Sequence, residues 1–228
     1  MGETFGRKAA KFYINLKKPP DISDKIEIIN PYENGEVKKT AKKFYDKFFN
    51  DYEKRVFIFG INPGRFGGGI TGINFTDPVA LREYCGIDNN FGNRRELSSQ
   101  FVYEFIYAFG GAEKFYKKFF ISAIYPLAIL NGGKNFNFYD DKKIYMFLKP
   151  SIIRYVEKQI QFGAKDELVI SLGKKNFTYL RELNDEIKYF KKIEFLEHPR
   201  FIMQYRRKQL KYFIRKYLKL LNMAAEFC

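Results

Sequence analysis

Four short apolar segments, each bounded by glycine, proline or polar residues, constrain the fold of this chain more than any other feature. They cover residues 56–61, 119–125, 168–173 and 193–196. Each segment is rich in β-branched and aromatic side chains and is too short for a buried helix, so each predicts a buried strand. Continuous apolar runs of this kind are typical of strands covered on both faces.

Segments with helical spacing of apolar residues separate these runs. We expect helices near residues 38–52, 97–109, 141–161, 174–183 and 202–222. Alternation of strands and helices predicts a parallel sheet with helices on both faces. We therefore expect an α/β fold, a three-layer α/β/α architecture around a four-stranded, mainly parallel sheet. In such sheets ligands bind at the carboxyl ends of the strands.

The 228 residues are enough to bury a full core. Residues 1–54 are weakly patterned, and we interpret them as an N-terminal helical arm packed on an α/β domain of residues 55–228. No apolar run reaches the roughly 20 residues that span a bilayer, and no apolar signal region follows Met1. We expect a cytoplasmic monomer. Cys85 and Cys228 are the only cysteines, too few for a four-thiolate site, so we expect no metal or other cofactor.

The chain carries a formal net charge of +15. Such a surplus favours a polyanionic partner, although general enrichment in lysine is an alternative explanation. Residues 200–219 hold eight basic residues and no acidic one. Exposed helices usually mix charge signs, so this run predicts contact with phosphates, with a solvated helix face as the alternative. Arg206, Arg207 and Lys208 are the first candidates.

Three of the predicted strands end in loops that carry candidate functional residues. Residues 60–67 (GINPGRFG) follow the first strand, and their glycines allow a ligand to approach the backbone closely. Asn62 offers a donor and an acceptor there. This loop is not a phosphate-binding loop, because the lysine and hydroxyl pair of that motif is missing. A simple strand-to-helix turn is the alternative.

Three more residues stand out in the loops that follow. Phe75 ends the segment 71–75 (TGINF), Asn135 ends 133–135 (GKN), and His198 precedes Pro199 after the last strand. Each has an ordinary alternative, namely a core phenylalanine, a loop asparagine and a structural histidine. His198 is the only histidine of the chain, so it cannot form a site with several histidines.

Together these motifs resemble those of the uracil-DNA glycosylase superfamily, most closely its single-strand-selective monofunctional branch. That branch is similar in its motif G-M-N-P-G-x-F-G followed by T-G-x-x-F, which corresponds to residues 60–67 and 71–75. Its Pro-Leu pair and G-R-N resemble Pro126-Leu127 and residues 133–135, and its His-Pro resembles His198-Pro199. The resemblance covers about residues 55–220.

The resemblance implies an enzyme that flips uracil, or a 5-substituted uracil, out of DNA and hydrolyses its N-glycosidic bond. Asn62 would position the attacking water, and His198 would stabilise the departing base. Phe75 would stack on the base and Asn135 would read its edge. The other expected site residues are Ile61, Gly64 and Phe66 around the base, and Arg65, Lys134, Arg200 and Phe201 along the DNA, in addition to Arg206, Arg207 and Lys208.

The chain departs from the family after Pro199, where the usual wedge sequence is replaced by residues 200–204 (RFIMQ). Phe201, Ile202 and Met203 are candidates for an apolar wedge in that segment. Two other functions remain open. One is a nucleic-acid-binding module of the same fold that lacks activity, and the other is an enzyme acting on small nucleosides.

Overall fold

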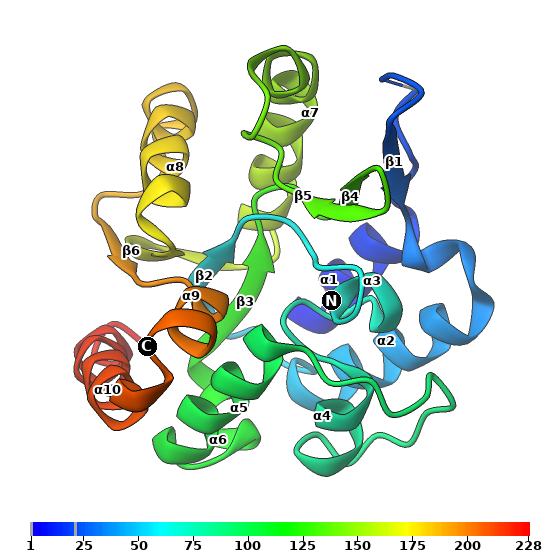
Figure 1. The fold of residues 1–228 in the computed structure, drawn as a ribbon. Helices are drawn as coiled ribbons and strands as arrows, with labels where there is room; N and C mark the ends of the chain where they lie inside the picture. Colours follow the sequence, from blue (N-terminus) through cyan, green and yellow to red (C-terminus); the bar gives the residue numbers. More distant parts are fainter. Residues whose placement is uncertain (1, 21) are drawn as a thin grey trace.

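The computed structural model describes residues 2–20 and 22–228, and a four-stranded sheet lies at its centre (Figure 1). Across the sheet the strands are β3 (Phe119–Ala123), β2 (Arg55–Gly60), β6 (Ala164–Leu172) and β7 (Ile193–Leu196). All neighbouring strands are parallel. Every residue of β2 and β3 is buried. The predicted α/β fold with four parallel strands is confirmed.

Helices pack against both faces of the sheet. Phe120 and Ser122 of β3 contact Phe5 and Tyr13 of the first helix, whereas Phe119, on the opposite face of the same strand, contacts Phe115. The α-helices are α1 (Phe5–Ile14), α2 (Gly35–Phe48), α3 (Gly68–Thr71), α4 (Pro78–Glu83), α5 (Leu97–Phe109), α6 (Ala112–Lys118), α7 (Lys142–Ile160), α8 (Lys174–Ile187), α9 (Pro199–Tyr205) and α10 (Leu210–Ala225), and two short 3-10 turns are η1 (Pro31–Glu33) and η2 (Arg207–Gln209). Among the described residues, no helix combines the length and the apolar character needed to cross a bilayer.

A second, antiparallel sheet was not predicted. It consists of β1 (Ile26–Ile29), β4 (Ala128–Asn131) and β5 (Lys134–Phe136). The segment 131–135, which we expected to be a loop, is a hairpin instead. Gly132 and Gly133 form its two-residue turn with φ of 53° and 74°, a conformation that favours glycine. The hairpin places Asn135 at the edge of this small sheet.

The expected helix at residues 202–222 is interrupted. It is divided into α9 and α10, and η2 lies between them. Arg206, which closes α9, has φ −130° and ψ 20°, so the chain changes direction there. The consequence is that α9 is free to lie beside α5 at the end of the sheet, while α10 packs separately against α5.

The N-terminal residues share the core of the rest of the chain. Phe5 stacks on Phe49 with ring centroids 5.4 Å apart and meets Phe120 of the central sheet at 5.0 Å. Strand β1 pairs with β4, about 100 residues further along the chain. The division of the chain at residue 55 stays a prediction, but the described residues before it contribute directly to the core, from Phe5 to Phe49.

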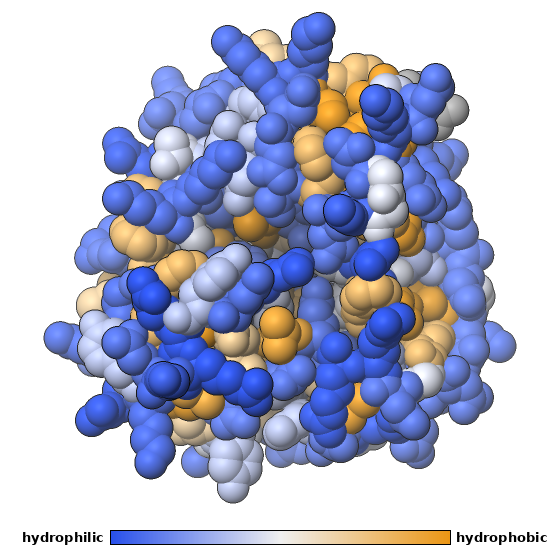
Figure 2. All heavy atoms as spheres, in the orientation of Figure 1, coloured by the Kyte–Doolittle hydropathy of each residue, from blue (hydrophilic) through white to orange (hydrophobic). Residues whose placement is uncertain are grey.

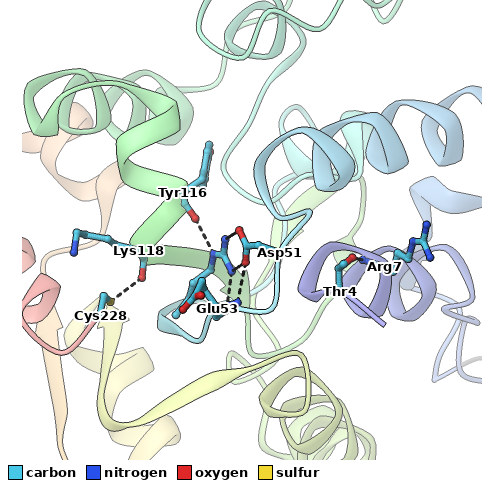
Figure 3. A network of polar contacts seen from close by, with 8 residues as sticks. Thr4, Arg7, Asp51, Glu53, Tyr116, Lys118 and Cys228 are labelled. Carbon is cyan, nitrogen blue, oxygen red and sulfur yellow. Dashed lines mark hydrogen bonds and ion pairs between the residues drawn. The ribbon is translucent and has the colours of Figure 1, made fainter. Parts of the chain in front are cut away.

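A fully buried arginine anchors the beginning of β2. The guanidinium of Arg55 donates to both carboxylate oxygens of Asp51, at 2.8 and 2.7 Å, and to the carbonyl oxygens of Glu53 and Tyr116, both at 2.8 Å. Figure 3 shows Asp51, Glu53 and Tyr116 around this network. A two-point arginine–carboxylate pair is among the strongest hydrogen-bonded pairs in proteins. It ties the segment after α2 to the central strand.

We predict that Asp51→Ala lowers the free energy of unfolding by about 2 kcal/mol, because it leaves a buried guanidinium without its counterion. The figure is below that for fully buried pairs, since 40% of the Asp51 side chain is exposed. Urea unfolding measures the change. Glu194→Ala breaks the exposed pair with Lys192 (2.9 Å) and serves as the control, with a smaller expected effect. Equal losses in the two variants would contradict this role for Asp51.

Candidate functional site

A cavity of about 320 Å³ opens where the loops after β2 and β7 meet the β4–β5 hairpin. Figure 2 shows the face of the molecule seen in Figure 1, where hydrophilic side chains surround smaller apolar patches. Segments far apart in the sequence contribute to the cavity wall. Its lining residues are Ile61, Asn62, Pro63, Gly64, Asn74, Phe75, Glu96, Ser98, Asn135, Asn137, His198, Arg200, Phe201, Gln204 and Tyr205.

Most of the residues expected to bind the base lie together in this cavity. The predicted set Ile61, Asn62, Gly64, Phe75, Asn135, His198, Arg200 and Phe201 is part of the lining. Phe66 lies outside it, and the guanidinium groups of Arg65 and Arg94 lie 4.3 and 4.0 Å from the centroid of its ring. The expected DNA-contacting cations Arg65, Lys134, Arg206, Arg207 and Lys208 also lie outside the lining.

The backbone of the hairpin segment fixes the side-chain amide of Asn62. Its Nδ2 donates to the carbonyl oxygen of Phe136 at 3.0 Å, and its Oδ1 accepts from the amide of Phe138 at 3.3 Å. These two bonds define which end of the amide is oxygen. Nδ2 keeps a second hydrogen and Oδ1 keeps a second lone pair, so Asn62 can still hold a water molecule or a ligand.

His198 is the N-cap of α9, and its position defines its protonation state. Its Nδ1 accepts a hydrogen bond from the backbone amide of Arg200 at 3.2 Å. An accepting Nδ1 carries no proton, so the neutral ring carries its proton on Nε2. Burial, together with the positive charge of Arg200, lowers the pKa of His198 to about 4. At neutral pH His198 is therefore an uncharged donor.

Phe75 adopts an unusual backbone conformation, and its ring lies directly against the end of β2. Its φ is 54°, a left-handed conformation that is costly for a bulky residue. A Cβ atom on Gly60 would overlap with Cε2 of the ring, so the ring fits because position 60 is glycine. The ring centroid is 5.8 Å from that of His198. The phenyl ring and the imidazole thus lie side by side in the cavity.

Asn135 links the hairpin to the loop after β2. Its Oδ1 accepts from the amide of Arg65 at 3.0 Å, and the Arg65 guanidinium bonds to the carbonyl oxygen of Gly133. The Nδ2 of Asn135 lies 3.6 Å from the position that a Cβ on Gly64 would occupy. The side-chain amide of Asn135 therefore lies beside Gly64 in the wall of the cavity.

Glu96, which the sequence analysis missed, contributes an ionisable group to the wall. Its Oε1 would overlap with a Cβ on Gly64, and its Oε2 would overlap with a Cβ on Gly67. Burial and the nearby Asp77 raise the pKa of Glu96 to about 7, against the opposing effect of Arg200. A side chain at either glycine would require this carboxyl group to move.

No sequence signal pointed to Glu96, since it precedes an ordinary amphipathic helix and is about 30 residues from the glycines that it contacts. Asn74, by contrast, belongs to the segment 71–75 and could have been included on that ground. The remaining unpredicted lining residues, Ser98, Asn137, Gln204 and Tyr205, enter the cavity only through the fold.

The rim of the cavity presents aromatic side chains on α9. Phe201 and Tyr205 are 40% and 61% exposed, and their ring centroids are 5.7 Å apart. Ile202 and Met203 are buried, so neither can act as the wedge that the sequence suggested. Of the three candidates only Phe201 can reach a partner.

The comparisons with known proteins agree with this geometry. A family model described as the uracil DNA glycosylase superfamily matches residues 47–222. The crystal structure of wild-type SMUG2 from Pedobacter heparinus is similar with a TM-score of 0.93 and 40% sequence identity, covering 96% of this chain and 97% of that one. A comparison with curated proteins finds no match.

The single histidine makes the protonation state of the site directly measurable. We predict that the imidazole NMR signals of His198 titrate near pH 4 and show the Nε2–H tautomer at pH 7, because burial disfavours the charged ring. The unfolded chain binds this proton near pH 6.5, so His198 costs stability as pH falls from about 6.5 to about 4. A midpoint near 6.5 in the folded protein would contradict the assignment.

Glu96 has the opposite effect on stability. The unfolded carboxyl releases its proton near pH 4.5 and the folded one near 7, so wild-type stability falls as pH rises through this window. We predict that Glu96→Gln stabilises the protein relative to wild type at pH 8 more than at pH 5, as measured by urea unfolding. Glu104→Gln, at an exposed position on α5, is the matched control. If both variants show the same pH dependence, Glu96 is not the responsible group.

Proposed function

The chain belongs to the uracil-DNA glycosylase superfamily, and we propose that it hydrolyses the N-glycosidic bond of uracil, or of a 5-substituted uracil, in DNA. The observation that carries this proposal is the state of His198. Its Nδ1 is occupied by the amide of Arg200, so its neutral Nε2–H is the donor available to a ligand in the cavity that Asn62 and Phe75 also line.

In the proposed reaction the bond between C1′ of the sugar and N1 of the base breaks, and its electron pair leaves with the base. The oxygen of a water molecule then bonds to C1′, and the proton that this water loses neutralises the base anion, directly or through solvent. The Nε2–H of His198 donates to a carbonyl oxygen of the base, where negative charge develops. One such preorganised donor can contribute about 3 kcal/mol. A neutral ring can stay in place through the reaction without first taking up a proton.

Asn62 supports the second half of the reaction. Its amide is held on both sides by the backbone of Phe136 and Phe138, so it has little freedom to rotate. The remaining lone pair of Oδ1 can accept from a water molecule and orient it toward C1′. Asn62 acts in this scheme by positioning and not as a strong base.

The walls of the cavity suit a flipped base. The Phe75 ring offers an apolar face on which a planar base can stack. The Nδ2 of Asn135, whose Oδ1 already accepts from Arg65, can donate to a base carbonyl. Extrusion of the base costs a few kcal/mol and is easiest at mismatched or unpaired positions.

We assign the DNA contacts to two sides of the cavity mouth. On one side are Arg200 and Phe201 of α9, followed by the exposed Arg206, Arg207 and Lys208. On the other side are Arg65 and Lys134 near the hairpin. The cations can bind phosphates, and the exposed ring of Phe201 can occupy the space left in the base stack.

The lining also supports a monofunctional enzyme. A glycosylase that cleaves the sugar–phosphate backbone through a Schiff base needs an amine nucleophile. Among the described residues, no lysine lines the cavity. Water is therefore the nucleophile that fits this site.

The test is an abasic-site assay on oligonucleotides that contain uracil, 5-hydroxymethyluracil, hypoxanthine or thymine. We expect wild type to act on the uracil substrates, and His198→Ala and Asn62→Ala each to lower kcat by about 10²- to 10³-fold. Asn15→Ala is the control, because this exposed side chain bonds to the carbonyl oxygen of Lys11 and, among the described residues, to no other group.

Absence of cleavage by wild type, or cleavage by both site variants at the wild-type rate, would overturn the proposal. Salt-sensitive binding without preference for uracil over thymine would instead support a binding module. Activity on free deoxyuridine alone would support a nucleoside-directed enzyme.

A further inference from the structure

Three buried tyrosines of the N-terminal segment lie together beneath the loop that carries Phe75. Tyr13 of α1 stacks on Tyr45 of α2, with centroids 5.6 Å apart and planes within 7°. Tyr32 of η1 lies 5.9 Å from Tyr13. All three side chains are at most 2% exposed. We call these three residues the tyrosine cluster.

Tyr32 binds the start of the loop. Its hydroxyl donates to the carbonyl oxygen of Gly72, the left-handed residue that ends α3. The ring also lies close against this residue, because a Cβ on Gly72 would be 2.7 Å from Cε1 of Tyr32. Hydrogen bond and ring contact together fix the point at which the chain turns toward Phe75.

Tyr13 binds the loop one residue before Phe75. Its hydroxyl accepts from Nδ2 of Asn74 at 3.4 Å, and Asn74 itself lines the cavity. The same hydroxyl bonds to Ser122 of β3 at 2.6 Å and to Gln159 of α7 at 3.2 Å. The Asn74 side chain is thereby connected to the central sheet and to α7.

The loop needs such support because of the conformation at Phe75. A φ of 54° is strained for a bulky residue, and it persists only where the surroundings impose it. The internal bonds of the loop involve Thr71 and Thr76, on either side of Phe75. Gly72 and Asn74, the two residues to which the tyrosine cluster bonds, lie just before Phe75 in this loop.

We propose that Tyr13 and Tyr32 are positioning residues for the base-stacking ring, and that the N-terminal segment is thus part of the base-binding apparatus. They hold residues 72–74 so that the Phe75 ring stays between Gly60 and the cavity. The consequence for the reaction rests on the proposed glycosylase function, whereas the consequence for the loop does not.

The first experiment measures amide hydrogen exchange in the folded, full-length chain and follows it in the fragment that covers residues 70–76. Tyr13→Phe and Tyr32→Phe keep the rings and remove only the hydroxyls. We expect exchange at the amides of Gly72, Ile73 and Thr76 to accelerate by about three- to tenfold in each variant. Tyr189→Phe is the matched control, because it removes a hydroxyl that donates to the carbonyl oxygen of Ala164, away from the cavity. Unchanged exchange in both test variants would overturn the proposal, whether or not the protein cleaves uracil.

The second experiment asks whether the hydroxyls act through Phe75. On a uracil-containing oligonucleotide, Tyr13→Phe should lower kcat/KM by about three- to tenfold, mainly by raising KM, because stacking holds the base before and during the reaction. In a Phe75→Ala background the same change should have no further effect. Equal effects of Tyr13→Phe in the two backgrounds would show that Tyr13 does not act through the ring.

The two readouts separate this inference from the proposed function. Faster loop exchange in a protein that leaves uracil intact would preserve the positioning role and defeat the glycosylase proposal. Uracil cleavage together with unchanged loop exchange and unchanged KM in the Tyr13 and Tyr32 variants would support the glycosylase proposal and overturn the positioning role.

Discussion

The missing side chain at Gly60 is the constraint on which the rest of the site depends. The last residue of β2 leaves its space to the Phe75 ring, which lies where any Cβ would be. Because the ring is held there, His198 from the last strand end can lie beside it. The central strand is in turn held at its other end by the buried Arg55. The strand that ends at Gly60 is therefore held at both of its ends, and this keeps Gly60 in place beside the ring.

The electrostatics of the cavity differ from those of its rim. Burial lowers the pKa of His198 and raises that of Glu96, so it favours the neutral form of both groups. Outside, the basic side chains that follow α9 are exposed. A polyanionic strand would be attracted to the rim, whereas an uncharged base would enter a cavity of mostly uncharged donors and acceptors. This division suits a site that must hold DNA at its surface and discriminate bases within.

The parts of the fold that could be predicted are those that depend on local patterns of residues. The four central strands could be predicted because each is an unbroken apolar run, and Asn62 and His198 because they directly follow such runs. The break at Arg206 could not, since the basic residues there are good helix formers and the change of direction depends on how α9 and α10 pack. Glu96 could not be predicted for a similar reason, because its contacts with Gly64 and Gly67 depend on the fold and not on the local sequence. The small sheet required pairing of β1 with β4, which no local signal specifies.

Gly64, Gly67 and Glu96 form a single steric unit, because the carboxyl oxygens fill the volumes that side chains at the two glycines would need. Substitution of either glycine alone would displace the carboxyl group, whereas a smaller residue at position 96 would release both positions at once. A variant library of the cavity should therefore include position 96 whenever it changes either glycine.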